Sequence, residues 1–394
     1  MATNTDIPQG YKATALGIIP QEWEVKTLGN IAEINPSKGK ITSKVVTFLA
    51  MSDISEQGGV INENILPIDS IKPGLTPFRK GDVIIAKITP CFENGKGALL
   101  DKITEDDGFG STEFHVIRCQ QDNKFVYYHT QSYAFRKRLE SQMTGSAGQK
   151  RVPADSVAAY KIAVPPLAEQ RKIAEVLGVW DKAIEKQARL IEKLALRKRG
   201  LMQRLLSAKL RLPGFSGPWK ELKINKITII RKGEQVNKDV LFSNAKYPVI
   251  NGGITPSGYL DIYNTKANTI TISEGGNSCG YVNFMTTPFW SGGHCYTIEA
   301  KDGINNLFIY QLLKNNEKYI MSLRVGSGLP NIQIKDLGNL KFMIPTYQEQ
   351  TAIAEVLTAS DREIELAKEK LERLRRQKRG LMQQLLTGKK RVKY

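Results

Sequence analysis

One stretch of the sequence, Glu169-Gln-Arg-Lys-Ile-Ala-Glu-Val-Leu177, occurs twice in the chain and determines how the rest is organised. Its second copy is Glu349-Gln-Thr-Ala-Ile-Ala-Glu-Val-Leu357, and the match extends without a gap over residues 165–206 and 345–386. At this constant offset of 180 residues, 21 of the 42 aligned positions are identical. Half identity over so long an ungapped segment indicates an internal duplication of the chain.

Both repeated segments are predicted to be long helices. Mostly apolar residues recur alternately four and three positions apart from Ile173 to Leu205 and from Ile353 to Leu385, with three polar interruptions in the first copy if the Trp180 indole is counted and two in the second. This 3.5-residue period is typical of a coiled coil. A proline precedes each segment, which suits a helix start. Each apolar stripe needs a partner, and we expect the two helices to pair with each other; the alternative is that each packs on its own domain. At a rise of 1.5 Å per residue, each helix would be roughly 60 Å long.

The segments before the two helices have the pattern of β-rich domains. β-Branched runs such as Asp82–Ile88 and Thr269–Ile272 alternate with turns rich in Gly, Asn and Pro. The run Asn123-Lys-Phe-Val-Tyr127 also resembles Asn306-Leu-Phe-Ile-Tyr310, which indicates that these domains are copies too. We therefore predict an α+β protein with β-rich domains at 1–164 and 212–344, a central helix at 165–211 and a distal helix at 345–394.

The charge of the chain points to a polyanionic partner. Its 394 residues include 57 Lys and Arg against 39 Asp and Glu, which gives a formal net charge of +18. The central helical segment carries 12 basic and 5 acidic residues and the distal one 12 and 7, so about a quarter of the chain holds two thirds of this excess. A solvated helix usually mixes both signs, and the one-sided excess favours contact with a phosphate backbone or an acidic protein.

No catalytic or cofactor-binding motif is recognised. The sequence lacks a phosphate loop of the form G-x-x-x-x-G-K-[ST], a complete dinucleotide loop, and the Asn/Asp-Pro-Pro-Tyr/Phe motif of adenine methyltransferases. The three histidines are scattered and the four cysteines lie far apart, so we expect neither a metal site nor a disulfide framework. No stretch approaches the ~20 consecutive apolar residues of a membrane span, and we expect no export signal and a cytoplasmic location. The chain is predicted to bind rather than to catalyse.

Several motifs in combination resemble one protein family. They are Lys80-Gly-Asp-Val-Ile-Ile-Ala-Lys-Ile-Thr-Pro-Cys-Phe-Glu-Asn-Gly-Lys96, Gly108-Phe-Gly-Ser-Thr-Glu-Phe-His115, Gly145-Ser-Ala-Gly-Gln-Lys-Arg-Val-Pro153 and Pro165-Pro-Leu-Ala-Glu-Gln170. With the tandem order of domains and helices, they resemble the specificity subunit of type I restriction–modification enzymes over nearly the whole chain. The second β-rich domain departs from the first, because its counterpart Ser273-Glu-Gly-Gly-Asn-Ser278 shares little sequence, which fits two different half-sites.

This resemblance implies a function in DNA recognition. Each β-rich domain would be a target-recognition domain that reads one half of a split, asymmetric sequence in double-stranded DNA. The two helices would run antiparallel, set the gap between the halves and dock two methylase subunits. Those subunits would bind S-adenosylmethionine and methylate adenine, and restriction (motor–nuclease) subunits would use ATP and Mg to cleave unmodified DNA. The chain itself would hold no cofactor or metal and catalyse no reaction, in the cytoplasm of a bacterium or archaeon.

Side chains with directed donors and acceptors on the predicted loops are the candidates for reading bases, because Arg and Lys suit guanine, and Asn and Gln suit adenine. They are Lys87, Asn94, Lys96, Gln149, Lys150 and Arg151 in the first domain, and Asn277, Ser278, His294, Arg324, Asn331 and Gln333 in the second. For each of them the alternative is a phosphate contact or plain solvent exposure. Two matching basic clusters in the helices are candidates for contact with the DNA backbone or the methylase subunits: Arg197, Lys198, Arg199, and Arg375, Arg376, Lys378, Arg379.

Two other classes of function stay open on the residues alone. One is an enzyme with an unrecognised site, which no motif supports. The other is a coiled-coil adaptor outside any restriction system, whose β-domains bind a ligand such as a peptide or glycan. The excess positive charge and the polar loops favour the DNA reader over the adaptor. Two such modules facing one side of B-DNA would read targets about one helical turn apart, roughly 10 bp between centres.

Overall fold

The chain divides into two compact units, and both boundaries fall inside the repeated segments. The computed structural model describes residues 7–37, 39, 41–146, 148–326 and 330–393, so Ala147 of the motif quoted above lies outside the described residues. Unit 1 consists of residues 1–186 and 371–394, and unit 2 of residues 187–370. Each unit therefore holds one β-rich domain and half of each repeated segment.

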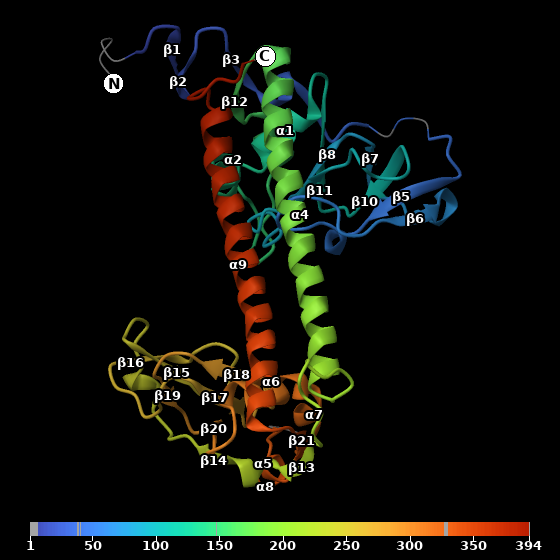
Figure 1. Ribbon diagram of the computed structural model, residues 1–394. Coiled ribbons are helices and arrows are strands. Elements are labelled where there is room, and N and C mark those ends of the chain that lie inside the picture. The colour runs from blue at the N-terminus through green and yellow to red at the C-terminus, as the bar shows by residue number, and fades with distance from the viewer. Residues whose placement is uncertain (1–6, 38, 40, 147, 327–329, 394) are drawn as a thin grey trace. The chain divides into compact units, whose positions relative to one another are not determined.

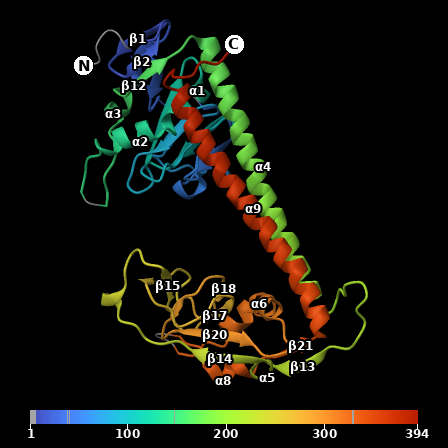
Figure 2. The same ribbon diagram turned by 60° about the vertical axis from the view of Figure 1, so that its left-hand side comes forward.

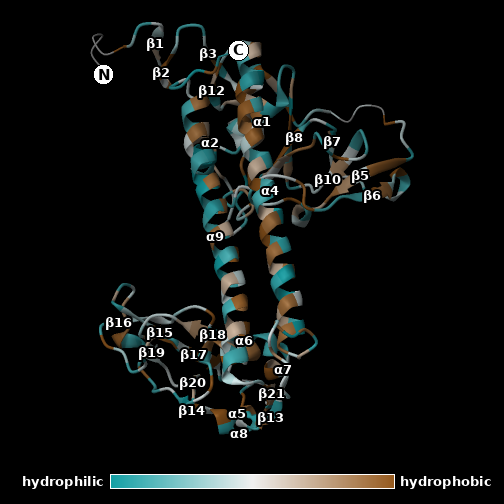
Figure 3. Cartoon of the chain, viewed as in Figure 1, coloured by the Kyte–Doolittle hydropathy of each residue, from teal (hydrophilic) through white to brown (hydrophobic). Residues whose placement is uncertain are grey.

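The repeated segments form the long helices α4 (Leu167–Leu205) and α9 (Tyr347–Leu385), each of 39 residues (Figure 1). Each helix starts shortly after a proline and has a glutamate in its first turn, where a negative charge interacts favourably with the helix dipole. Within each unit, the α4 half lies alongside the α9 half in both views of the ribbon (Figures 1 and 2). Polar and apolar residues are interspersed along both helices, as expected for amphipathic helices (Figure 3).

The two helices pair with each other, as the heptad pattern predicts, and they run antiparallel, as the family resemblance implies. In unit 1, Leu177 near the start of α4 shares a core with Leu385 at the end of α9. In unit 2, Leu357 near the start of α9 shares a core with Leu205 at the end of α4. The same cores contain the buried residues of the β-rich domains, so the start of each helix also packs on its own domain. Each apolar stripe thus covers the other helix and a domain at once.

Polar residues in the helix pair are matched between the two copies. The amide of Gln187 is buried and donates to the backbone oxygen of Ala367, 2.9 Å away, and these two positions are equivalent in the repeat. Two lysines of the helix pair, each mostly buried, form ion pairs with aspartates of the opposite helix. These pairs are Lys198–Asp361 and Lys378–Asp181, each with 2.5 Å between the nitrogen and a carboxylate oxygen. The offset of 180 residues converts one pair into the other.

The first β-rich domain is built on buried strands that end in polar loops. Its strands are β1 (Tyr11–Thr14), β2 (Gly17–Pro20), β3 (Glu24–Thr27), β4 (Ala32–Ile34), β5 (Val45–Leu49), β6 (Asn64–Pro67), β7 (Thr76–Arg79), β8 (Val83–Ala86), β9 (Gly97–Leu99), β10 (Asp107–Gly110), β11 (Phe114–Cys119) and β12 (Lys161–Val164). Its helices are α1 (Asn123–Thr130), α2 (Tyr133–Glu140) and α3 (Ala154–Ala158). One sheet has the order β4-β11-β8-β9 and packs against α1; another has the order β6-β5-β10-β7.

The second β-rich domain repeats this plan. Its strands are β13 (Lys220–Lys223), β14 (Thr228–Lys232), β15 (Tyr247–Ile250), β16 (Gly258–Leu260), β17 (Thr269–Ser273), β18 (Val282–Met285), β19 (Trp290–Ser291), β20 (Cys295–Ala300) and β21 (Lys341–Ile344). Its helices are α5 (Ile224–Ile227), α6 (Asn306–Asn315), α7 (Glu317–Ser322) and α8 (Ile334–Gly338). The sheet β14-β20-β17-β18, which packs against α6, corresponds to β4-β11-β8-β9, and a smaller sheet has the order β16-β15-β19.

The short sequence similarity between the two domains marks equivalent helices. Asn123–Tyr127 opens α1 and Asn306–Tyr310 opens α6, and each helix has a side-chain cap. The Asp122 carboxylate accepts from the third residue of α1, and the Asn305 side chain does the same in α6. The duplication predicted from the sequence therefore extends to the β-rich domains.

A buried carboxylate ties the start of each long helix to its domain and to the segment that follows the other long helix. In unit 1, Glu169 accepts a hydrogen bond from the Trp23 indole at 3.0 Å and two from the Arg391 guanidinium at 2.6 and 2.8 Å. The equivalent residues in unit 2 are Glu349, Trp219 and Arg211. We call each set of three residues a carboxylate lock.

No helix in the described part of the chain is both long enough and apolar enough to span a lipid bilayer.

Candidate nucleic-acid interface

The polar loops of the first domain gather at the end of strand β8. The N–H of Lys87, the residue that follows this strand, donates to the Glu113 carbonyl at 2.9 Å, and its own carbonyl accepts from Val152 at 2.8 Å. Arg151, one residue earlier, forms a backbone bridge with Ile88. These bonds hold three loops together that are far apart in the sequence.

Two of the predicted residues of the first domain, Lys87 and Arg151, meet at this point. The Arg151 guanidinium forms an ion pair with Glu113, with 2.8 Å between Nη2 and Oε1 and with Nε at 3.0 and 3.1 Å from the two carboxylate oxygens. These hydrogen bonds, with the Lys87 charge in addition, hold the pKa of Glu113 below its ordinary value. The Arg151 side chain remains 43% exposed, so its outer edge can still donate to a ligand.

The other candidates of the first domain differ in how far they are engaged. The Lys96 ammonium is half-buried and donates to the Met51 carbonyl at 2.9 Å, so it holds the loop in place. The exposed Asn94 amide donates to Glu56 at 2.9 Å. The side chains that face solvent most freely are Gln149 and Lys150.

The second domain uses the same backbone arrangement with different side chains. Glu274 follows strand β17, donates from its N–H to the His294 carbonyl at 2.9 Å, and accepts from the Ile332 N–H at 2.8 Å. Asn331, one residue earlier, forms a backbone bridge with Gly275. Glu274, His294 and Asn331 therefore hold the places that Lys87, Glu113 and Arg151 hold in the first domain.

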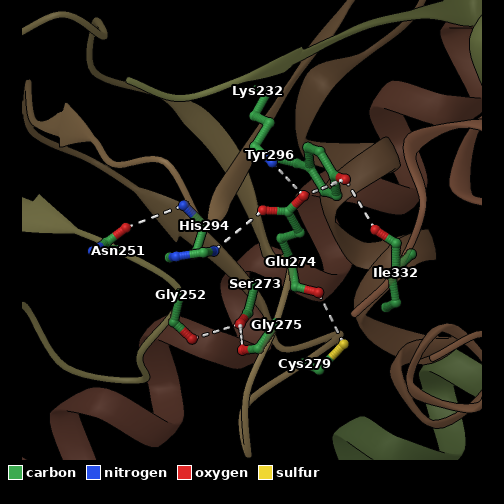
Figure 4. Close-up of polar contacts among 10 residues, drawn as sticks. All are labelled: Lys232, Asn251, Gly252, Ser273, Glu274, Gly275, Cys279, His294, Tyr296 and Ile332. Atoms are coloured by element: carbon green, nitrogen blue, oxygen red, sulfur yellow. Dashed lines mark hydrogen bonds and ion pairs between the residues drawn. The ribbon is translucent and has the colours of Figure 1, made fainter. Parts of the chain in front are cut away.

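The Glu274 carboxylate is buried and is bound mainly through one of its oxygens (Figure 4). Oε1 accepts from the Lys232 ammonium at 2.6 Å and lies 3.0 Å from the Tyr296 hydroxyl. Oε2 has no hydrogen-bond partner among the described residues and lies 3.5 Å from Nδ1 of His294. Burial raises the pKa of the Tyr296 hydroxyl, which therefore acts as a neutral donor. We call Glu274, Lys232, Tyr296 and His294 the Glu274 cluster.

The remaining candidates of the second domain lie on loops next to this cluster. Gly276, two residues after Glu274, has a φ of 74°, a conformation that favours glycine. It lies directly before the candidates Asn277 and Ser278. Ser278 is half-buried, and the exposed candidates are Asn277, Arg324, Asn331 and Gln333. The side chains that the sequence reasoning missed are Glu274, Lys232, Tyr296 and Glu113. For Glu274 a signal was present, since it is a charged residue between a buried strand and a Gly-Gly turn.

A buried side chain in each domain holds the loop junction in place by contacting a backbone carbonyl. In the first domain, His115 Nε2 donates to the Val152 carbonyl at 2.7 Å, and its Nδ1 lies 3.0 Å from the Asn35 amide. Burial lowers the pKa of His115, so the neutral ring can donate on one side and accept on the other. In the second domain, the Tyr296 hydroxyl lies 2.9 Å from the equivalent Ile332 carbonyl. His115 is therefore a structural residue, and the contact of Tyr296 with the Ile332 carbonyl has the same structural role.

The seven basic helix residues divide into two groups. Four have acidic partners within their own unit: Lys198 with Asp361, Lys378 with Asp181, Arg197 with Glu363, and Arg375 with Glu372. Arg375 also donates to Gln57 in the first domain. The exposed residues of the second group are Arg199, Arg376 and Arg379. These three present their charge to solvent, and an outside partner can reach them.

The side chains at the loop junctions suit binding. Within the described residues, no group of three or more His, Cys, Asp or Glu is arranged to hold a metal ion. All four cysteines are free. Burial raises the pKa of the Cys295 thiol to about 12, and burial also raises the pKa of the Cys279 thiol above its ordinary value, so both are protonated at neutral pH. What the loops offer is a set of hydrogen-bond donors and acceptors on a fixed backbone.

Two domains of one plan, each with polar side chains at the same loop junction, define a duplicated binding protein. The chain belongs to the family of the type I restriction modification DNA specificity domain, whose model matches residues 20–195 and 217–376. Each matched stretch contains most of one β-rich domain and much of the long helix that follows it.

Among named relatives, the chain is similar to the specificity subunits of the type I restriction enzymes EcoAI and EcoEI of Escherichia coli. It is 42% identical to the first over 39% of this chain, and 38% identical to the second over 42% of this chain. These matches span only 27% and 28% of the two subunits. A putative type I restriction enzyme MjaX specificity subunit of Methanocaldococcus jannaschii is 26% identical and is matched over 97% of its length and 98% of this chain.

The fold is also that of a solved structure. The type I restriction–modification S subunit from M. genitalium aligns with a TM-score of 0.63 and 19% sequence identity, over 98% of each chain. A second solved structure, from work on the structural basis of complex assembly and conformational transition in the type I restriction–modification system, aligns with a TM-score of 0.61 over 94% of this chain. At this level of identity the likeness shows the shared fold, and it confirms the predicted α+β fold with two long helices.

Proposed function

We propose that this protein is the specificity subunit of a type I restriction–modification complex and reads a split target in double-stranded DNA. Each β-rich domain reads one half of the target through the loops at the ends of β8 and β17. The observation that carries the proposal is one backbone arrangement with two different sets of polar side chains. A duplicated reader with different side chains suits an asymmetric target, because base edges differ in their pattern of donors and acceptors.

The antiparallel helices set the gap between the halves of the target and dock two methylase subunits. The exposed Arg199, Arg376 and Arg379 supply positive charge for the DNA backbone or for an acidic surface of these subunits. S-adenosylmethionine binds to the methylase subunits, and ATP and Mg bind to restriction subunits when these are present. The chain itself acts without catalysis, in the cytoplasm of a bacterium or archaeon.

The experiment is to express the chain with the methylase subunits of its host in a strain that lacks this methylation. Sequencing of methylated bases should find adenine methylation at a split motif with a fixed gap. Omitting the chain is the control and should abolish the methylation, and the purified chain alone with S-adenosylmethionine should methylate nothing. Methylation of the same motif without the chain, or by the chain without methylase, would contradict the proposal.

The alternative function, a coiled-coil adaptor outside any restriction system, is not favoured. The DNA specificity domain model matches both β-rich domains, and a peptide-binding or glycan-binding adaptor would not explain this match. The same expression experiment separates the two functions, since an adaptor would leave the methylation of the host unchanged.

A further inference from the structure

The Glu274 cluster and its counterpart in the first domain share a backbone arrangement but differ in their side chains, and the charge at the central position is reversed. Where the first domain has Lys87, the second has Glu274, and where the first has Glu113, the second has His294. The two backbone bonds have the same lengths in both domains, 2.9 Å for the N–H of Lys87 or Glu274 and 2.8 Å for its carbonyl. Since either set of side chains is compatible with the same backbone, the reversal points to a difference in what the two junctions bind.

The Glu274 carboxylate is held in one orientation. Oε1 is bound by Lys232 and by Tyr296, as described above. The backbone carbonyl of Glu274 accepts from the Ile332 N–H and also from the Cys279 thiol, whose sulfur lies 3.0 Å away (Figure 4). A side chain fixed at both ends can discriminate between ligands, because it does not reorient to suit a wrong one.

The second carboxylate oxygen is buried but has no hydrogen-bond partner among the described residues. Buried polar atoms in proteins almost always have a hydrogen-bond partner, but Oε2 of Glu274 has none among the described residues. Its neighbour at 3.5 Å, His294 Nδ1, belongs to an imidazole whose side chain is 61% exposed. The exposed Asn277 and Asn331 flank the junction on the same loops. Oε2 therefore lies behind a single exposed side chain, that of His294.

The ligand for such an oxygen is a hydrogen-bond donor, and DNA offers one kind in the major groove. Cytosine N4 and adenine N6 are exocyclic amino groups, and carboxylates accept from such groups in protein–DNA complexes. A lone carboxylate would repel the phosphates, but Lys232 at 2.6 Å offsets its charge. The cluster can thus approach DNA and still present an acceptor.

We propose that Glu274 is a specificity-determining residue of the second domain, and that its Oε2 accepts a hydrogen bond from the exocyclic amino group of a cytosine or adenine. His294 covers this oxygen in the free protein and moves aside when DNA binds. The inference rests on the proposed function and deepens it, because it assigns one base position of the target to one side chain.

The test compares Glu274→Gln with a matched control, Glu299→Gln. Both substitutions remove one negative charge from the second domain, and Glu299 is an exposed residue of strand β20 paired with Arg231. Each full chain is assembled with the methylase subunits, and the methylated motif is determined by sequencing. Glu274→Gln should reduce the preference at one position of the half-site read by the second domain about tenfold. The other half-site, and the whole motif of the Glu299→Gln protein, should stay as in the wild type.

Base analogues identify the donor. At the affected position, adenine is replaced by purine, or cytosine by 2-pyrimidinone, each of which lacks the exocyclic amino group. Binding of the wild-type complex should weaken about tenfold with the analogue of the base that Glu274 contacts. The Glu274→Gln complex should lose no further affinity with this analogue. An equal loss in both proteins would overturn the inference.

The outcomes also separate this inference from the proposed function. If the wild-type complex methylates no split motif, the proposed function fails and this inference fails with it. If the split motif is methylated and Glu274→Gln leaves it unchanged, or alters the half-site of the first domain, only this inference fails. Should Glu274→Gln not fold, Glu274→Asp keeps the charge and withdraws the carboxylate by one methylene. It should relax the same position, and an unchanged motif would overturn the inference.

Discussion

The carboxylate lock of unit 1 provides a sharp test of how the unit is held together. Glu169 is fully buried, and Arg391 is its charged partner, with a side chain that is 32% exposed. Changing Arg391 to Met keeps most of the aliphatic stem and leaves the carboxylate buried without a countercharge. Removing one partner of a buried ion pair costs about 3–5 kcal/mol, and the partial exposure of Arg391 reduces our expectation to about 2 kcal/mol.

The effect should be confined to unit 1. A loss of about 2 kcal/mol corresponds to a roughly 30-fold larger equilibrium constant for local opening, and therefore to roughly 30-fold faster native-state hydrogen exchange. The amides to follow are those of the β3–β12 pair, where Ile162 pairs with Lys26 directly before α4 begins. The matched variant Arg211→Met should instead accelerate exchange in the β13–β21 pair of unit 2.

A double-mutant cycle tests the electrostatic reasoning itself. In a Glu169→Gln background, Arg391→Met should cost at least about 1 kcal/mol less than in the wild type, because no buried charge is then left alone. Equal costs in both backgrounds would mean that Arg391 acts through packing or through its ion pair with Glu22, 3.0 Å away, and not through Glu169. Exchange that is unchanged by Arg391→Met, or accelerated equally in both units, would refute the role of the lock.

Three further predictions concern the helices and a buried histidine. Changing the exposed Arg199 and Arg379 to Gln should reduce the slope of log K for DNA binding against log salt concentration by about one unit for each phosphate that is no longer neutralised. Changing Lys198 and Lys378 should instead lower the urea midpoint of unfolding, because these two lysines form ion pairs between the helices. Gln187 and Ala367 contact each other, and one heptad inserted after each of them adds about 10 Å to each helix. The gap in the methylated motif should then widen by about 3 bp while its bases stay the same. An unchanged gap would show that the helices do not set it. Burial lowers the pKa of His129 to about 3 from 6.5, so the unfolded chain binds a proton that the folded chain does not, and this residue should weaken the fold by up to about 1.4 kcal/mol per pH unit as the pH falls from 6.5 towards 3. His129→Phe should flatten that loss in urea unfolding at pH 7 and pH 5, and an equal pH dependence in both proteins would contradict it.

The repeat and the heptad pattern predict the helices well, because a helical stripe is a local property of the sequence. The strands at 83–86 and 269–273 also fall within or close to runs recognised by their β-branched residues. The loop junctions were only partly predictable. Lys87 and Arg151 were singled out by residue type, but their meeting depends on backbone bonds between distant segments.

The acidic members of the site show why residue type alone was insufficient. A search for Arg, Lys, Asn and Gln passes over Glu274, whose importance depends on its burial and on Lys232, 42 residues earlier. Likewise, the sequence assigns Lys198 and Lys378 to basic clusters that face a partner. The structure places both in ion pairs with aspartates of the opposite helix, an interaction that depends on the antiparallel register and on no local pattern.

The division of the helices between the units has a consequence for synthesis on the ribosome. Unit 2 is one continuous segment, 187–370, so all its parts are available once that segment has emerged. Unit 1 lacks residues 371–394 until translation reaches the distal end of α9 and Arg391. A nascent first domain therefore has the stripe at Ile173 and Leu177 covered by its own domain but not by the end of α9, and a carboxylate at Glu169 without its guanidinium. We expect the domain made first to be completed last: unit 2 can close once residues 187–370 have emerged from the ribosome, whereas unit 1 stays open until residues 371–394 follow.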